Sequence, residues 1–316
     1  MIPIREPMLA PDTASTQEEL EALGLPWLAD EGHILASEKL NGIRCLIYPD
    51  REYPIGRSGD ELKNRALKDY LKHCFDFARY HKMILDGELY SQHATWGEHL
   101  RTANSIDRKP TASFDLQVFD GLTEKEWLGE RPTNPFYERG RWLECETKHS
   151  PVRFLEHAKL TWKQILETHA KIIERGGEGL ILRSTEGGYK HGRCTTREGI
   201  IWKFKAWKTF DGVIVDVKQQ NLLSADAQLS YDQYGRIKRD SKATSRELVE
   251  ACGALKLKLS DGREVDVGSG FTDLQRRDLW RRKEEIIGLT VEIRGTNCGS
   301  VSRPLAPTFL RFKDET

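Results

Sequence analysis

Lys39 begins the segment Lys-Leu-Asn-Gly, which lies between two apolar runs that we interpret as strands, and its amine is a candidate nucleophile. A lysine attacks only after its amine has lost a proton, and neighbouring positive charge favours that loss. Lys203 and Lys205 alternate along Trp-Lys-Phe-Lys, so their side chains point to the same face of a predicted strand. We expect this pair to supply positive charge beside Lys39 and to bind a phosphate group.

Two glutamates stand next to glycines in predicted strands. Glu88 follows Asp-Gly, and Glu178 lies between two glycines. A glycine lets a ligand approach the backbone closely, and carboxylate oxygens are ligands that Mg²⁺ prefers. Transfer of a nucleotide to Lys39 requires carboxylates that hold Mg²⁺, or Mn²⁺ in its place, and the hydroxyls of the ribose, and Glu88 and Glu178 are the candidates.

Aromatic and basic residues complete a possible nucleotide site. Phe119, in Gln-Val-Phe-Asp-Gly, is a candidate platform on which a base stacks. Arginines bind phosphates with paired, charge-assisted hydrogen bonds, and Arg44, Arg57, Arg303 and Arg311 are candidates for that role.

Each of these residues also has a purely structural interpretation. A single lysine on a turn is more often a solvated surface residue, and a phenylalanine in a strand is more often part of the core. Glu88 and Glu178 could form salt bridges at strand ends, and Lys203 with Lys205 could protect an edge strand from aggregation. Only the occurrence of all these residues in one chain favours the chemical interpretation.

The elements that must position these residues form a mixed pattern up to about residue 208. Strands are predicted over 34–37, 43–48, 83–90, 114–119, 179–183 and 200–204, and helices over 61–79, 135–147 and 158–175. A capping-box pattern at 15–18 predicts a further short helix. Interspersed strands and helices predict an α+β domain over 1–208, built on mixed or antiparallel sheets.

The pattern changes after residue 208. Short strands are predicted over 213–217, 255–259, 265–267 and 289–294, with one helix over 272–283. Several short strands with one interposed helix are typical of a small β-barrel such as the OB-fold, so we expect an OB-fold domain over 209–316. Within it the polar stretch 219–244 is interpreted as a long surface loop or a partly disordered insertion.

Length and composition limit the class of protein. A chain of 316 residues is long enough for two cores. Its 49 basic and 49 acidic side chains give no net charge, which still permits a local basic groove for a polyanion. The six cysteines form no Cys-x-x-Cys pair, no apolar run is long enough to span a membrane, and the N-terminus has no signal-peptide pattern. We expect a cytoplasmic protein with reduced cysteines and no membrane partner.

Taken together, the motifs resemble those of the ATP-dependent DNA ligases, a branch of the covalent nucleotidyltransferases. The matching segments are 7–10, 39–44, 56–59, 85–89, 114–120, 178–183 and 201–205 in the first predicted domain, and 267–271 and 303–314 in the second. They occur in the order of the family and cover almost the whole chain. The compact size is similar to that of the minimal ligases of bacteriophages and some bacteria.

The resemblance implies a reaction in three steps. Lys39 attacks ATP and carries AMP, the AMP passes to the 5′-phosphate of a nick in duplex DNA, and the 3′-hydroxyl then displaces AMP and seals the strand. The resemblance also implies a monomer, located in the host cytoplasm for a phage protein.

The same resemblance assigns roles to individual residues. In the family pattern, residues matching Arg44 and Glu88 contact the ribose, and the match to Phe119 stacks on adenine. Glu38 would contact the nucleotide, Lys203 and Lys205 would bind the AMP phosphate, and Arg303 and Arg311 would bind the pyrophosphate. Glu88 and Glu178 would take part in the metal-assisted steps. Arg44, Arg57 and Phe271 would contact the DNA.

Two positions depart from the family pattern, and rival functions share part of it. Asn41 stands where the family has aspartate, and the order Arg311-Phe-Lys-Asp differs from the usual Arg-x-Asp-Lys. An RNA ligase is an alternative that Asn41 favours and the second domain disfavours. A GTP-dependent mRNA capping guanylyltransferase shares the lysine and both folds. An inactive nucleic-acid-binding module is the alternative that is not an enzyme, and the presence of Lys39 counts against it.

Overall fold

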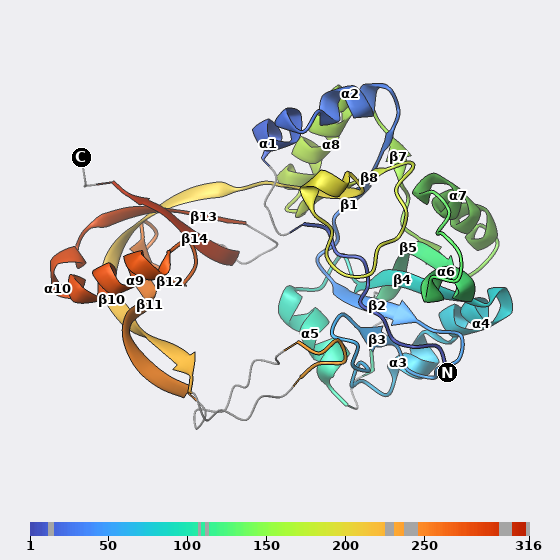
Figure 1. Ribbon diagram of the computed structural model, residues 1–316, viewed down its shortest axis with the longest axis horizontal. Helices are drawn as coiled ribbons and strands as arrows, with labels where there is room; N and C mark the ends of the chain where they lie inside the picture. The colour runs from blue at the N-terminus through green and yellow to red at the C-terminus, as the bar shows by residue number, and fades with distance from the viewer. Residues whose placement is uncertain are drawn as a thin grey trace. The chain divides into compact units, whose positions relative to one another are not determined.

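The computed structural model describes residues 1–11, 16–106, 109–110, 114–224, 231–236, 246–296 and 305–313 (Figure 1). The chain divides into two compact units, and each is described by itself. The first unit comprises Met1–Lys205 with Asp232–Arg236, and the second comprises Ala206–Tyr231 with Ile237–Thr316. Arg303, Ser15, Asp314 and most of the predicted loop lie outside the described residues.

Two sheets form the framework of the first unit. One has the order β3 (Ile55–Gly56), β2 (Ile43–Ile47), β4 (Met83–Tyr90), β5 (Asp115–Thr123) and β6 (Arg153–Phe154). The other has the order β7 (Ala158–Lys159), β1 (Ile34–Glu38), β8 (Gly179–Ser184) and β9 (Ile201–Lys205). All pairs are antiparallel except β5 with β6. The predicted α+β class with mixed and antiparallel sheets is confirmed.

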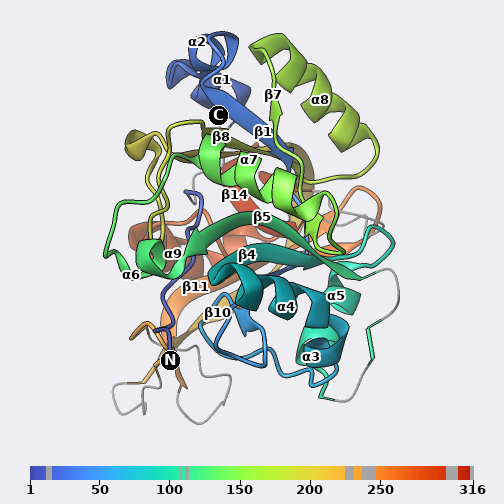
Figure 2. The same cartoon turned by 90° about the vertical axis from the view of Figure 1, so that its right-hand side faces the viewer.

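Helices cover these sheets (Figure 2). They are α1 (Gln17–Ala22), α2 (Leu25–Asp30), α3 (Leu67–Tyr70), α4 (Lys72–His81), α5 (Trp96–Asn104), α6 (Glu124–Leu128), α7 (Phe136–Thr147) and α8 (Trp162–Glu174), with a 3-10 turn at Thr196–Glu198. Phe75 of α4 packs into the core formed with β2, β4 and β5. Ile165 and Ile172 of α8 pack on the sheet that contains β1 and β8. Each sheet therefore has its own hydrophobic core.

Three helix predictions need correction, and capping explains two of them. Thr16 caps α1 with Glu19, one residue later than the predicted box. Thr161 and Gln164 form a capping box that starts α8 at Trp162, so the preceding residues are free to form β7. The helix predicted over 61–79 begins only at Leu67 and is interrupted at Leu71.

The described residues of the second unit form one five-stranded sheet and two short helices. Its order is β12 (Glu264–Val267), β11 (Arg246–Leu259), β10 (Lys208–Leu223), β13 (Thr290–Thr296) and β14 (Leu305–Phe312). The helices are α9 (Asp273–Arg281) and α10 (Lys283–Ile286). An isolated bridge joins Ser269, just after β12, to Thr308 of β14, which brings the two ends of the sheet together. Leu279 and Ile286 from the helices close its core.

The predicted loop over 219–244 is wrong at its start. Residues 219–223 continue β10 and pair with residues 246–252 at the start of β11. This pairing satisfies their backbone hydrogen bonds, so they form a strand and not a loop. Residues 232–236 then form a turn that belongs to the first unit. Among the described residues, no helix is long and apolar enough to cross a membrane.

Candidate active site

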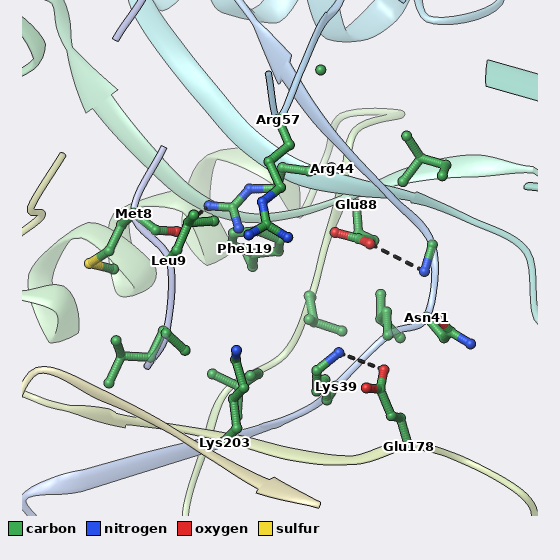
Figure 3. A pocket seen from close by; sticks show the side chains of 18 of the residues that line it. Met8, Leu9, Lys39, Asn41, Arg44, Arg57, Glu88, Phe119, Glu178 and Lys203 are labelled. Atoms are coloured by element: carbon green, nitrogen blue, oxygen red, sulfur yellow. Dashed lines mark hydrogen bonds and ion pairs between the residues drawn. The ribbon is translucent and has the colours of Figure 1, made fainter. Parts of the chain in front are cut away.

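Lys39 lies directly after β1, and the charged residues around it come from the position just before β8 and from the end of β9, the next two strands of the sheet. Its backbone N–H donates to the Gly179 carbonyl at 2.9 Å. Its Nζ lies 2.5 Å from Oε2 of Glu178 (Figure 3). Lys205 forms an ion pair with Oε1 of the same carboxylate. The register explains this grouping, because Glu38 pairs with Leu180 and Gly179 pairs with Lys205. Adjacent strands β1, β8 and β9 therefore deliver three charged side chains to one point.

The electrostatics of Glu178 follow from this position. Burial raises the pKa of its carboxyl, but Lys39 and Lys205 outweigh burial and hold that pKa below its ordinary value. Glu178 is therefore an ionised carboxylate shared between two amines. Lys203, two residues before Lys205, lines the same cavity.

Glu88 lies across the cavity from Glu178 (Figure 3). Its Oε1 accepts a hydrogen bond from the Gly42 N–H at 3.2 Å. A Cβ atom at Gly42 would lie 2.4 Å from the Leu89 carbonyl oxygen, so only glycine lets the turn after Lys39 approach β4. Burial raises the pKa of Glu88 to about 7, although Arg44 and Lys39 act in the other direction.

Arg44 is held from several sides. Its Nε and Nη2 donate to the two carboxylate oxygens of Asp86, each at 2.6 Å, and Nη2 also donates to the Met8 carbonyl at 2.9 Å. Its guanidinium carbon lies 4.7 Å from the ring centroid of Phe119. The Tyr189 hydroxyl donates to Oδ2 of Asp86 at 2.6 Å. The guanidinium thus has a fixed orientation beside the aromatic ring.

A cavity of about 780 Å³ brings most of the predicted site residues together. Those that line it are Glu38, Lys39, Arg44, Arg57, Glu88, Phe119, Glu178, Lys203 and Lys205, and Asn41 lines it as well. Glu38 also forms an ion pair with Arg175.

Two predicted site residues belong to the second unit, and a third is not among the described residues. Arg311 belongs to the second unit, where its Nε lies 2.8 Å from Oε2 of Glu292. Phe271 also belongs to the second unit, and its ring packs 4.8 Å from that of Phe309. Arg303 is outside the described residues.

Sequence reasoning missed several residues of the site. Asp86 lies within the matching segment 85–89, but nothing in the local sequence shows that it orients Arg44, because the two residues are on the paired strands β4 and β2. Tyr189 joins the site from 103 residues away. Arg236, in the turn 232–236, lines the cavity and its Nη1 lies 2.6 Å from Oε1 of Glu6. No sequence signal marks that turn, which lies within the loop predicted over 219–244.

Comparisons with known proteins agree with this architecture. The family model described as ATP dependent DNA ligase domain matches residues 7–205, and the model described as DNA ligase OB-like domain matches residues 247–313. A sequence comparison with curated proteins gives no match.

Solved structures share the fold. A structure described as "DNA binding with a minimal scaffold: Structure-function analysis of Lig E DNA ligases" is 18% identical, with a TM-score of 0.65, and the match covers 98% of this chain and 100% of that one. A structure named Pmar-Lig_PreS3 is 21% identical, with a TM-score of 0.67, over 98% of this chain and 68% of that one. Because the first family model alone matches more than half of the chain, this protein belongs to the ATP-dependent DNA ligases and is a ligase enzyme.

Proposed function

We propose that this ligase seals nicks in duplex DNA that carry a 5′-phosphate and a 3′-hydroxyl, and that Lys39 is the residue that carries AMP. The observation that carries the proposal is the shared carboxylate of Glu178, with Lys39 on one oxygen and Lys205 on the other. It gives the nucleophile a fixed position in a cavity that also contains the candidate ribose, base and phosphate contacts.

In the first step the Lys39 amine, once deprotonated, attacks the α-phosphorus of ATP. A nitrogen–phosphorus bond forms, the bond between the α-phosphorus and the bridging oxygen breaks, and pyrophosphate leaves with the electron pair of that bond. Such a displacement depends mainly on in-line positioning and on neutralising charge on the phosphate oxygens. Lys203 and Lys205, on β9 in the same sheet, line the cavity with Lys39 and are the cations for that purpose.

The donor set suits a Mg²⁺ ion, with Mn²⁺ as the alternative. The described residues contain no cluster of three or more His, Cys, Asp or Glu side chains that could hold a metal alone. Mg²⁺ is commonly bound by one or two carboxylates together with substrate phosphates and water, which fits Glu88 and Glu178. When bound, the ion would neutralise negative charge on the phosphates. A cation at Glu178 would compete with Lys39 and Lys205 for the same carboxylate oxygens.

The adenosine contacts follow from the fixed orientation of Arg44. Asp86 and Tyr189 hold its guanidinium, so little side-chain entropy is lost when it binds a ribose. The Phe119 ring beside it offers a stacking surface for the base.

In the later steps AMP passes to the 5′-phosphate of the nick, for which Arg57 in the cavity wall is the candidate contact. The 3′-hydroxyl then attacks that phosphate, and AMP leaves. We assign contacts to the duplex backbone to the OB-like unit, including Phe271, and such contacts do not read sequence. We assign to Arg311 the pyrophosphate contact that the family pattern gives to the segment 303–314. The protein is expected to act as a cytoplasmic monomer.

The test is incubation with α-labelled ATP and Mg²⁺, followed by denaturing electrophoresis. The protein should become labelled, Lys39→Ala should abolish the label, and Lys68→Ala, at an exposed lysine paired with Glu52, should leave it unchanged. Label that survives Lys39→Ala contradicts the assignment. Labelling by GTP instead would favour a capping enzyme, and sealing of nicked RNA instead of nicked DNA would favour an RNA ligase.

A further inference from the structure

One wall of the cavity is built by a segment that passes between the two sheets of the first unit. Residues 155–157 connect β6, an edge strand of one sheet, to β7, an edge strand of the other. Leu155 N–H donates to the Val118 carbonyl at 2.7 Å, directly before Phe119. At the other end Ala158 pairs with Ala36, three residues before Lys39. The segment therefore runs along the cavity from the candidate base platform towards the nucleophile.

His157 projects from this segment into the cavity wall. Leu155 and His157 line the cavity, whereas Glu156 between them is exposed, as the alternation of an extended chain requires. The His157 ring packs edge-on against Phe136 with centroids 4.9 Å apart. No motif of the sequence marked this residue, and the nucleotide contacts proposed above do not use it.

The surroundings of His157 keep its imidazole neutral. Asp120 is fully buried between Arg139 and Arg183, with a nearest nitrogen–oxygen distance of 2.8 Å to each guanidinium. The cluster thus carries one negative and two positive charges before the histidine is counted. Burial and Arg183 lower the pKa of His157 to about 3, and Asp120 and the Leu155 carbonyl act weakly in the other direction. A neutral imidazole has one N–H and one nitrogen with a free lone pair.

We propose that His157 selects the base of the nucleotide, by accepting a hydrogen bond from the exocyclic 6-amino group of adenine when the base stacks on Phe119. Nδ1 is enclosed by protein without a hydrogen bond to any described residue. This contact uses the tautomer in which the enclosed Nδ1 carries the ring proton, so that the lone pair of Nε2 is the acceptor. Guanine presents a carbonyl oxygen at the same position, which repels that lone pair. The inference rests on the proposed function and specifies which nucleotide its site accepts.

The preference for the 6-amino group can be measured by comparing ATP with purine riboside triphosphate, which has hydrogen in place of that group. The readout is formation of the lysyl-nucleotide in a single turnover at several nucleotide concentrations. In the wild-type protein the half-saturating concentration of the analogue should be about tenfold higher than that of ATP, the effect of one hydrogen bond.

Two variants separate base selection from packing. His157→Leu keeps a side chain of similar bulk but has no hydrogen-bond acceptor. The half-saturating concentration of ATP for this variant should rise to that of the analogue, and the value for the analogue should stay unchanged. His157→Asn retains an acceptor oxygen and should keep part of the preference. An equal loss for both nucleotides in His157→Leu would indicate a packing role and overturn the proposal.

The outcomes also distinguish this inference from the proposed function. If the wild-type protein is labelled by ATP but does not discriminate ATP from the analogue, the assignment of His157 fails and the function stands. That comparison needs no variant, so it holds even if His157→Leu does not fold. If neither ATP nor the analogue labels the protein, the proposed function fails and the assignment of His157 fails with it.

Discussion

Lys39 and Glu178 lie 139 residues apart in the sequence, yet Nζ of the lysine is 2.5 Å from Oε2 of the glutamate. The second oxygen of this carboxylate is taken by Lys205. One buried negative charge therefore fixes the positions of two amines, one next to β1 and one on β9, on either side of β8. The predictions that follow test this arrangement and the supports around it.

Glu178→Gln should slow formation of the lysyl-adenylate by roughly a hundredfold. The amide keeps the size of the side chain but removes the charge that holds Lys39 and Lys205 and that would bind Mg²⁺. Single-turnover labelling with ATP measures the rate, and Glu174→Gln, at the end of α8, is the control. A rate within twofold of the wild-type value would show that the shared carboxylate has no part in the first step.

Asp86→Asn should reduce the free energy of unfolding by about 3 to 5 kcal/mol, because it leaves the guanidinium of Arg44 without its bidentate partner. Tyr189→Phe removes only one hydrogen bond to Asp86 and should cost about 1 kcal/mol. Urea denaturation measures both changes. Asp76→Asn, which breaks an exposed pair with Lys72, is the control and should change stability by less than about 0.5 kcal/mol. Equal effects of Asp86→Asn and Asp76→Asn would disprove the role of Asp86.

Glu88 should make the folded protein less stable as the pH rises. Its pKa is about 7 in the folded state against an ordinary value of 4.5, so the folded state binds the proton more tightly than the unfolded state. The stabilisation from this proton is present below about pH 4.5 and is lost as the pH rises through about 7, a difference of roughly 3 kcal/mol. Glu88→Gln stays neutral and should therefore be more stable than the wild type at pH 8.

The measurement for Glu88 is urea denaturation of the wild type and of Glu88→Gln at pH 5, 6, 7 and 8. The advantage of the variant should grow with pH over this range. Glu156→Gln changes an exposed glutamate and is the control, for which no such trend is expected. A constant difference between Glu88→Gln and the wild type at every pH would contradict the raised pKa.

Gly179→Ala should destabilise the first unit by at least about 3 kcal/mol, because its backbone is at φ +136° and a Cβ atom would lie 2.1 Å from the Phe204 carbonyl oxygen. Gly176→Ala is the matched control: its φ is +84°, but no atom lies within 4 Å of the added Cβ. That control should cost about 1 kcal/mol, so the difference measures the close approach of β8 and β9. Similar losses in both variants would show that this approach is unimportant.

Asn41→Asp should lower the Mg²⁺ concentration required for half-maximal adenylation by about threefold to tenfold. The residue lines the cavity that contains Glu88 and Glu178, and a further carboxylate there attracts a divalent cation. Titration of the labelling reaction with Mg²⁺ measures the shift, and Asn134→Asp, outside the cavity lining, is the control. An unchanged Mg²⁺ requirement would mean that position 41 does not influence the metal.

The sequence alone determined the types of the reacting residues and their local settings. Lys39, Glu88, Phe119 and Glu178 stand at strands or strand ends beside residues that allow close approach, and these are short-range properties that a motif records. The change near residue 208 from interspersed strands and helices to mostly strands is also a local pattern, although β10 and β11 are longer than the short strands that the sequence predicts. It predicted an OB-like fold for the second part of the chain, and residues 247–313 match an OB-like family model.

Only the tertiary structure decided which of these residues meet. Glu178 reaches both Lys39 and Lys205 because β8 pairs with β1 and β9 in one particular register, and a shift by one residue would turn the side chains to the other face. Tyr189 contacts Asp86, 103 residues away in the sequence, and His157 lines the cavity from the connection between two sheets. Neither position belongs to a periodic pattern of apolar residues, so the sequence does not mark it. Pairing of distant strands is a property of the whole fold, so no local segment contains it.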